Sequence, residues 1–182
     1  MMEKKNKLLE YSVVYGLILG LIIVLYQIML YFFGLLNNNI LEPVIFFLVV
    51  IGTMLAVRHY RDSVNGGLLN FAKSYQIGFF TCVITGIIKA IYTYFQVKYL
   101  SPNLADEALT LAQESLLNRG YTDEQVELGS TILKNHIHLI VSISDFIRIC
   151  FWGALLSLVI ASIMKRDENP LQTRNTGNNN KL

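Results

Sequence analysis

Charged residues are scarce in this chain of 182 residues. Only 15% of its residues are Asp, Glu, Lys or Arg, against about 25% in an average soluble protein. Hydrophobic residues make up 53%, and they come in long blocks that the core of a soluble domain does not need. The formal net charge is only +2, so no strongly basic face is available and nucleic acid is not an expected partner. The composition indicates a protein whose main partner is the lipid bilayer.

Cysteine pairs and catalytic motifs are also lacking. The two cysteines, Cys82 and Cys150, provide neither a disulfide framework nor zinc-ligand spacing. His136 and His138 are two residues apart, so they do not share a helix face, and we predict no metal site. The sequence has no HExxH, GxSxG or GxxxxGK[ST] motif. We therefore predict a protein that is not an enzyme and has no cofactor.

Four apolar segments are long enough to cross a bilayer, which takes roughly 20 residues in a helix. They are residues 11–33, 41–57, 75–97 and 139–164. Pro43 stands at the start of the second segment, where its missing N–H group costs nothing. The predicted fold class is all-α, an integral membrane bundle of four transmembrane helices. Residues 1–10 form a short polar N-terminus, and residues 165–182 are predicted to be a disordered tail.

Two polar segments separate the later spans. Residues 58–74 are predicted to be a loop that turns at Asn65-Gly66-Gly67. Residues 98–138 are acidic, and their periodicity predicts two short amphipathic helices, 104–117 and 123–134, in a hairpin. Asn103 is the expected cap of the first helix, and Thr122 with Gln125 forms a capping-box pattern for the second.

The distribution of lysine and arginine predicts the orientation. Outside the spans, ten of the thirteen cations lie in the N-terminus, the 58–74 loop and the C-terminal tail. Cytoplasmic loops are enriched in these residues, so both termini are predicted to be cytoplasmic. The hairpin between spans three and four would then be extracytoplasmic.

Small residues recur every four positions in two spans. Span three has Gly78, Cys82, Gly86 and Ala90, and span four has Gly153, Ser157 and Ala161. Small side chains let helices approach closely in lipid, where packing drives association. We expect these two stripes to face one another. Gly16 and Gly20 form a GxxxG step in span one, which has dimerisation as one alternative role.

Three charges inside the spans are the main candidate site. Lys89 lies in span three, and Asp145 and Arg148 lie in span four. Because these spans run in opposite directions, all three residues fall in the outer half of the bundle. We expect Lys89 to pair with Asp145, with Arg148 nearby. The alternatives are an ion pair that fixes helix register, a substrate or ion site, and a lysine that reaches to the outer interface.

The loop and span three together resemble a known family. The matching residues are Tyr60-Arg61-Asp62, Gly66-Gly67 and Phe71-Ala72-Lys73, which leads to Gly78. The chain resembles an uncharacterised family of small four-span bacterial membrane proteins, the domain of unknown function numbered 4199. The resemblance implies a bacterial inner-membrane protein and supplies no activity, cofactor or catalytic residue. Two roles are open for Tyr60-Arg61-Asp62: Arg61 anchors to lipid phosphate while Asp62 caps or pairs locally, or the three residues form a cytoplasmic docking site for a partner protein.

Two functions remain open at this level. The leading hypothesis is a non-enzymatic accessory or interaction protein of the inner membrane. The alternative is a small oligomeric transporter or channel that uses Lys89, Asp145 and Arg148. Four spans are few for a transporter made of one chain, so the second hypothesis requires self-association. Expected partners are therefore the bilayer and either a second copy of the chain or another membrane protein.

Overall fold

Helices account for nearly all of the residues that the structure describes. A computed structural model describes residues 2–35, 41–100 and 102–165. Within these ranges the elements are α1 (Met2–Phe32), α2 (Glu42–Ser63), α3 (Phe71–Phe95), the π-helical turn η1 (Gln96–Leu100), α4 (Pro102–Asn118) and α5 (Asp123–Met164). Residues 166–182 of the predicted tail lie outside the described residues.

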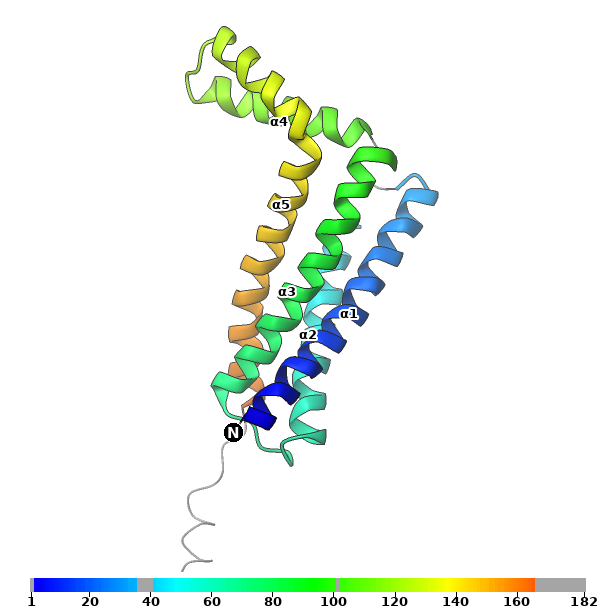
Figure 1. Cartoon of the computed structure of the whole chain (residues 1–182), viewed down its shortest axis with the longest axis vertical. Helices are drawn as coiled ribbons and strands as arrows, with labels where there is room; N and C mark the ends of the chain where they lie inside the picture. Colours follow the sequence, from blue (N-terminus) through cyan, green and yellow to red (C-terminus); the bar gives the residue numbers. More distant parts are fainter. Residues whose placement is uncertain (1, 36–40, 101, 166–182) are drawn as a thin grey trace, which may run out of the picture.

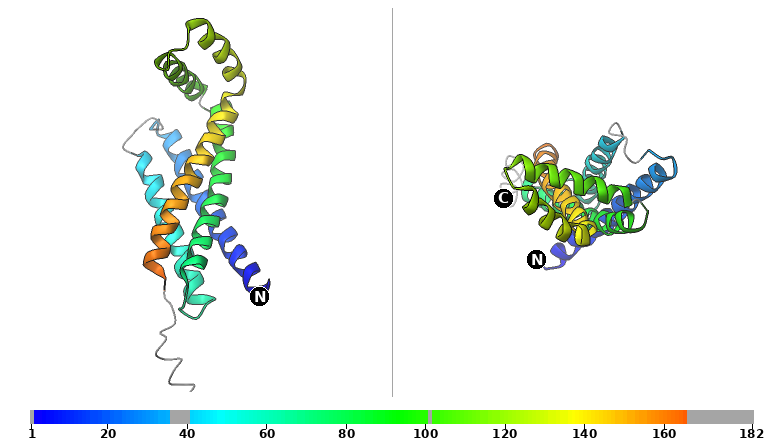
Figure 2. Two further views of the ribbon diagram at one scale, coloured as in Figure 1. Left: turned by 90° about the vertical axis from the view of Figure 1, so that its left-hand side faces the viewer. Right: turned by 90° about the horizontal axis from the view of Figure 1, so that it is seen from above.

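Among the described residues, four helices carry apolar segments long enough to cross a membrane. These segments are Lys7–Phe32, Pro43–Ser63, Phe71–Leu100 and Leu133–Met164. The long helices run along one another, and α4 lies across one end of the bundle (Figures 1 and 2). The all-α fold class of a four-helix membrane bundle is confirmed, and the chain is a multi-pass membrane protein. We call the end with α4 the hairpin end, and the opposite end, where residues 64–70 connect α2 to α3, the loop end.

Close contacts between α3 and α5 hold the centre of the bundle. A Cβ atom added at Gly153 would lie 2.5 Å from Cys82 Cβ, and one at Gly78 would lie 2.7 Å from Ser157 Oγ. Neither glycine could carry a side chain without moving its neighbour. The two small-residue stripes therefore face one another, as expected from their spacing.

The GxxxG step of α1 packs inside the same chain. A Cβ at Gly16 would lie 2.6 Å from Ile84 Cβ, and one at Gly20 would lie 2.7 Å from Ile88 Cδ1. The Thr85 hydroxyl also donates a hydrogen bond to the Gly16 carbonyl oxygen at 3.2 Å. These contacts bring α1 against α3, so the GxxxG step serves the fold of the chain itself.

The predicted loop at 58–74 was too long. Helix α2 continues to Ser63, and α3 already begins at Phe71. Gly66 and Gly67 make the turn, with φ values of +63° and +83°, which side-chain-bearing residues rarely adopt. The hydrophobic run ends near Val57, but a helix does not stop where its residues become polar, so hydropathy alone placed the boundary too early.

The predicted hairpin forms, but its second helix is not separate. Thr122 and Gln125 make the expected capping box, and the helix that they start continues through the membrane segment to Met164. Helix α4 packs against the first turns of α5 (Figure 1). Helix α4 begins at Pro102, so Asn103 lies inside it and was wrongly predicted as its cap. Similarly, α1 begins at Met2 and includes most of the predicted polar N-terminus.

Candidate functional site

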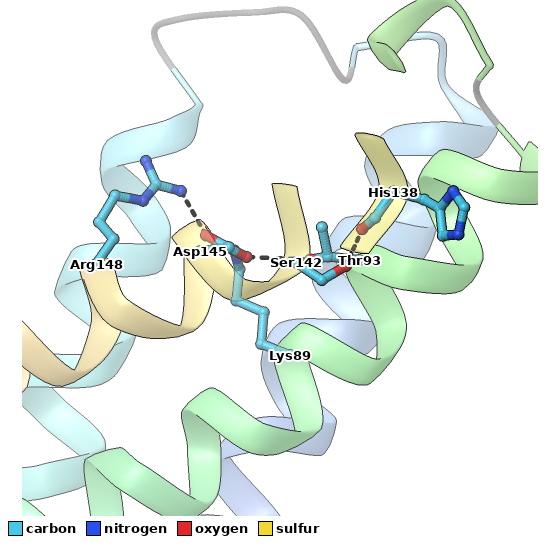
Figure 3. A network of polar contacts seen from close by, with 6 residues as sticks. All are labelled: Lys89, Thr93, His138, Ser142, Asp145 and Arg148. Atoms are coloured by element: carbon cyan, nitrogen blue, oxygen red, sulfur yellow. Dashed lines mark hydrogen bonds and ion pairs between the residues drawn. The ribbon is translucent and has the colours of Figure 1, made fainter. Parts of the chain in front are cut away.

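The charged residues predicted inside the spans come together between α3 and α5 (Figure 3). Lys89 Nζ forms an ion pair with Asp145 Oδ2. Arg148, one turn further along α5, donates from Nη2 to Asp145 Oδ1 at 2.8 Å. The two cations thus approach one carboxylate from different helices. We call Lys89, Asp145 and Arg148 the charge cluster.

A threonine donates a further hydrogen bond to the Asp145 carboxylate. The Thr93 hydroxyl, one turn after Lys89 on α3, donates to Asp145 Oδ2 at 3.0 Å. Both oxygens of Asp145 therefore accept hydrogen bonds, and one of them accepts two. This arrangement stabilises an ionised carboxylate at a place where an unpaired charge would be strongly unfavourable.

Burial differs sharply within the charge cluster. Lys89 is 3% exposed and Asp145 is 7% exposed, whereas the Arg148 side chain is 54% exposed. Two cations face one carboxylate, so the charge cluster carries a formal charge of +1. Arg148 is therefore the accessible member of the charge cluster.

A large cavity lies at the hairpin end, between the bundle and α4. Its volume is about 620 Å³. Its walls are mainly apolar and include Leu30, Val97, Leu111 and Ile137. Its polar lining residues are Gln27, Lys89, Thr93, Gln96, Glu107, Ser144, Asp145 and Arg148. We call this space the hairpin cavity. It places the charge cluster within reach of a ligand that enters from the hairpin end.

A smaller and more apolar cavity lies between α2 and α5. Its volume is about 270 Å³, and it is lined by Pro43, Ile45, Phe46, Val49, Lys89, Arg148, Ile149, Trp152, Gly153 and Leu156. We call it the α2–α5 cavity. Ile45, Lys89 and Arg148 line both cavities. The charge cluster therefore stands where the hairpin cavity, with its polar lining residues, meets a more apolar space.

Thr93 and the cavities were not anticipated from the sequence. The signal for Thr93 was present, because Thr81, Thr85, Lys89 and Thr93 recur every four residues on α3. This spacing puts them on one face, the same way that it aligns the small residues. The hairpin cavity had no comparable signal, since it depends on how α4 and the start of α5 are placed over the bundle.

The residues of the loop signature build the connection between α2 and α3. Tyr60 is 1% exposed in the core, and Arg61 Nε donates to Asp62 Oδ1 at 2.8 Å. The Gly67 N–H donates to the Arg61 carbonyl oxygen at 2.9 Å. Lys73 follows in the first turn of α3, where its N–H donates to the capping side chain of Asn70 at 3.0 Å. The signature thus has a clear role in shaping this turn.

The loop signature and the charge cluster are separate sites. Lys73 precedes Lys89 by sixteen residues on the same helix, which corresponds to about 24 Å along its axis.

His138, one of the two histidines near the hairpin, meets the Tyr94 ring edge-on at 4.9 Å between centroids. Among the described residues, no group of three or more His, Cys, Asp or Glu side chains is placed to hold a metal ion.

Comparison with known proteins agrees with the resemblance in the sequence. No curated protein and no solved structure matches the chain. The family described as "Protein of unknown function (DUF4199)" matches residues 14–166. This match covers the membrane bundle except for the first part of α1, and it includes both cavities and the charge cluster. The chain belongs to the DUF4199 family.

Proposed function

We propose that this chain is a non-enzymatic accessory protein of the bacterial inner membrane that acts by binding a ligand or partner in the hairpin cavity. The observation that carries the proposal is the cavity itself, about 620 Å³ in volume with the charge cluster in its wall. Pockets of this size, with mainly apolar walls and a few convergent polar groups, are typical binding sites. The packing of the bundle between this cavity and the loop end favours ligand binding over the transport of a solute.

Between the hairpin cavity and the loop end, the polar side chains are buried by packing. Thr81 and Thr85 are 0% exposed, as are Ser12 and Ser157. The Thr81 and Thr85 hydroxyls donate to backbone carbonyls of their own helix at 2.8 and 2.9 Å. None of these four residues lines either of the two cavities. They are therefore enclosed by the packing of the helices.

A photo-crosslinking experiment tests the binding role. A photoreactive residue in place of Leu111, which lines the hairpin cavity and is 61% exposed, should give a discrete adduct in native membranes. The matched control is Leu128, which is 66% exposed on the same hairpin and does not line that cavity. We expect no discrete adduct from Leu128. Equal labelling at both positions would argue against a binding site in the cavity.

The alternative function, a small oligomeric transporter, has one observation in its favour. The polar face of α3 continues from Lys89 through Thr85 and Thr81 toward the loop end. In proteoliposomes, the accessory role predicts no solute or ion flux above that of empty vesicles. A flux that Lys89→Ala abolishes would replace the accessory role by the transport role.

We also propose that the loop end is cytoplasmic. The cations counted outside the spans gather at this end, including Arg58, Arg61 and Lys73, which is typical of the cytoplasmic side. Single-cysteine variants test this orientation. In intact cells, a membrane-impermeant maleimide should label Tyr121→Cys in the hairpin, and should label Ser63→Cys only after permeabilisation. The reverse labelling pattern would invert the orientation.

A further inference from the structure

Two cavities of different character meet at the charge cluster. The hairpin cavity is polar at the cluster and has a volume of about 620 Å³. The α2–α5 cavity has a volume of about 270 Å³ and is lined by apolar residues such as Phe46, Val49, Trp152 and Leu156. Lys89 and Arg148 line both. A ligand that fills both spaces must therefore be amphiphilic, with a polar part and an apolar part joined near these two cations.

We propose that the occupant is a phospholipid with an amine-bearing head group. Its phosphate lies against Arg148 and Lys89, its head group extends into the hairpin cavity, and one acyl chain enters the α2–α5 cavity. This inference names the ligand class of the hairpin cavity and so rests on the proposed function. The surrounding bilayer supplies such a molecule directly.

The charges of the cluster favour a phosphate. Lys89 and Arg148 both pair with Asp145, and they leave a formal charge of +1. A phosphodiester carries a charge of −1, and both cations attract it. Arg148 is suited to this contact because its side chain is 54% exposed, and because guanidinium groups match phosphate oxygens in geometry. Figure 3 shows Arg148 reaching Asp145 from the side opposite to Thr93.

Acceptor groups elsewhere in the hairpin cavity favour an amine. Glu107, on α4, lines the cavity and brings a carboxylate to it. Gln27, on α1, also lines it, and the Gln27 Oε1 atom is buried without a hydrogen-bond partner among the described residues. An ammonium group donates to such acceptors. The order of cations at the cluster and acceptors beyond it matches a phosphoethanolamine head group, in which the amine follows the phosphate.

The α2–α5 cavity suits an acyl chain. Phe46 and Trp152 meet edge-on at 6.4 Å between centroids, and they are 43% and 51% exposed. These side chains lie on the outer faces of α2 and α5, which contact lipid in a membrane bundle. Apolar burial against these walls would add to the binding of the head group.

Lipid binding to the full-length protein tests the proposal. The protein is purified in a mild non-ionic detergent and titrated with dioleoyl phosphatidylethanolamine, and bound lipid is counted by native mass spectrometry. Arg148→Gln should weaken binding by about tenfold or more, since a charge-assisted contact is lost. Lys98→Gln is the matched control, because Lys98 is a cation at the same end that lines neither cavity. It should bind lipid as the wild type does.

Two further variants separate the parts of the proposal. Ile45→Trp fills the junction of the two cavities and leaves all three charges in place, so it should also weaken binding if it retains the thermal stability of the wild type. Glu107→Gln should reduce the preference for phosphatidylethanolamine over phosphatidylglycerol.

The proposal would be overturned if Arg148→Gln and Ile45→Trp both bound the lipid as strongly as the wild type does. It would also be overturned if inorganic phosphate displaced the lipid completely, because the site would then recognise phosphate alone. If these lipid-binding tests fail while the photoreactive residue at position 111 still gives its adduct, the ligand is not a phospholipid. The proposed binding function of the hairpin cavity would then remain.

Discussion

The Asp145→Asn variant is expected to lose about 3–5 kcal/mol of unfolding free energy. The carboxylate of Asp145 neutralises Lys89, which is only 3% exposed, and asparagine cannot replace its charge. Lys89 would then either remain charged without the Asp145 carboxylate beside it or lose its proton, and both outcomes favour the unfolded state. The loss can be measured by titrating the purified protein in mixed micelles with a denaturing detergent, with helix content as the readout.

Double substitution tests whether the two groups act as a pair. Lys89→Met alone should cost less than Asp145→Asn, because Asp145 keeps its contacts with Arg148 and Thr93. The variant that carries both substitutions should be more stable than the sum of the two losses predicts, by at least about 1 kcal/mol. Additive losses would contradict a coupled pair. Asp62→Asn serves as a control, because Asp62 is 48% exposed in its ion pair with Arg61 and should change stability by no more than about 1 kcal/mol.

The charge cluster could be predicted because helix geometry fixes depth. Counting residues from the ends of two antiparallel spans places Lys89 and Asp145 at a similar level, and burial of unpaired charge in lipid favours their contact. The same count cannot show which groups line an open space. Only the position of α4, set by the turn at Gly120 and by the direction of the first turns of α5, creates the hairpin cavity.

Helix boundaries were the weakest part of the prediction, for a physical reason. Hydropathy marks where residues leave the hydrocarbon region, whereas a helix ends where its backbone finds a cap or a turn. Residues Arg58–Ser63 are polar but contain no glycine or proline, so α2 continues until the turn at Gly66 and Gly67. Likewise no proline interrupts residues 123–164, and a single continuous α5 results. The turn at Gly66 and Gly67 and the capping box of Thr122 with Gln125 were predicted at the correct positions, whereas Asn103 lies inside α4 and is not its cap.

The close approach of α3 and α5 depends on glycine at position 153. We expect Gly153→Leu to lower the unfolding free energy by about 3 kcal/mol or more, since overpacking of a tight interface is costly. The first atom of any side chain at this position would lie 2.5 Å from Cys82 Cβ and 2.9 Å from Cys82 Sγ. Cys82 is 0% exposed and in contact with Thr53 on α2, so it has no free space into which to move. The two helices would have to separate, which would also disturb the contact of Lys89 with Asp145.

Exchanging the sizes of the residues at positions 153 and 82 tests this contact directly. Gly153→Ala should cost about 1–3 kcal/mol, and adding Cys82→Gly should recover part of that loss, because it removes the atom that the new methyl group meets. Gly129→Ala is the matched control on the same helix, where the nearest atom to an added Cβ is Leu116 Cδ1 at 4.0 Å. Alanine there should be neutral or stabilising by up to about 1 kcal/mol, as alanine favours helices over glycine. If Gly153→Ala and Gly129→Ala had the same effect, close packing of α3 on α5 would not be what holds the bundle together, and the level of the charge cluster would have to be set by other contacts.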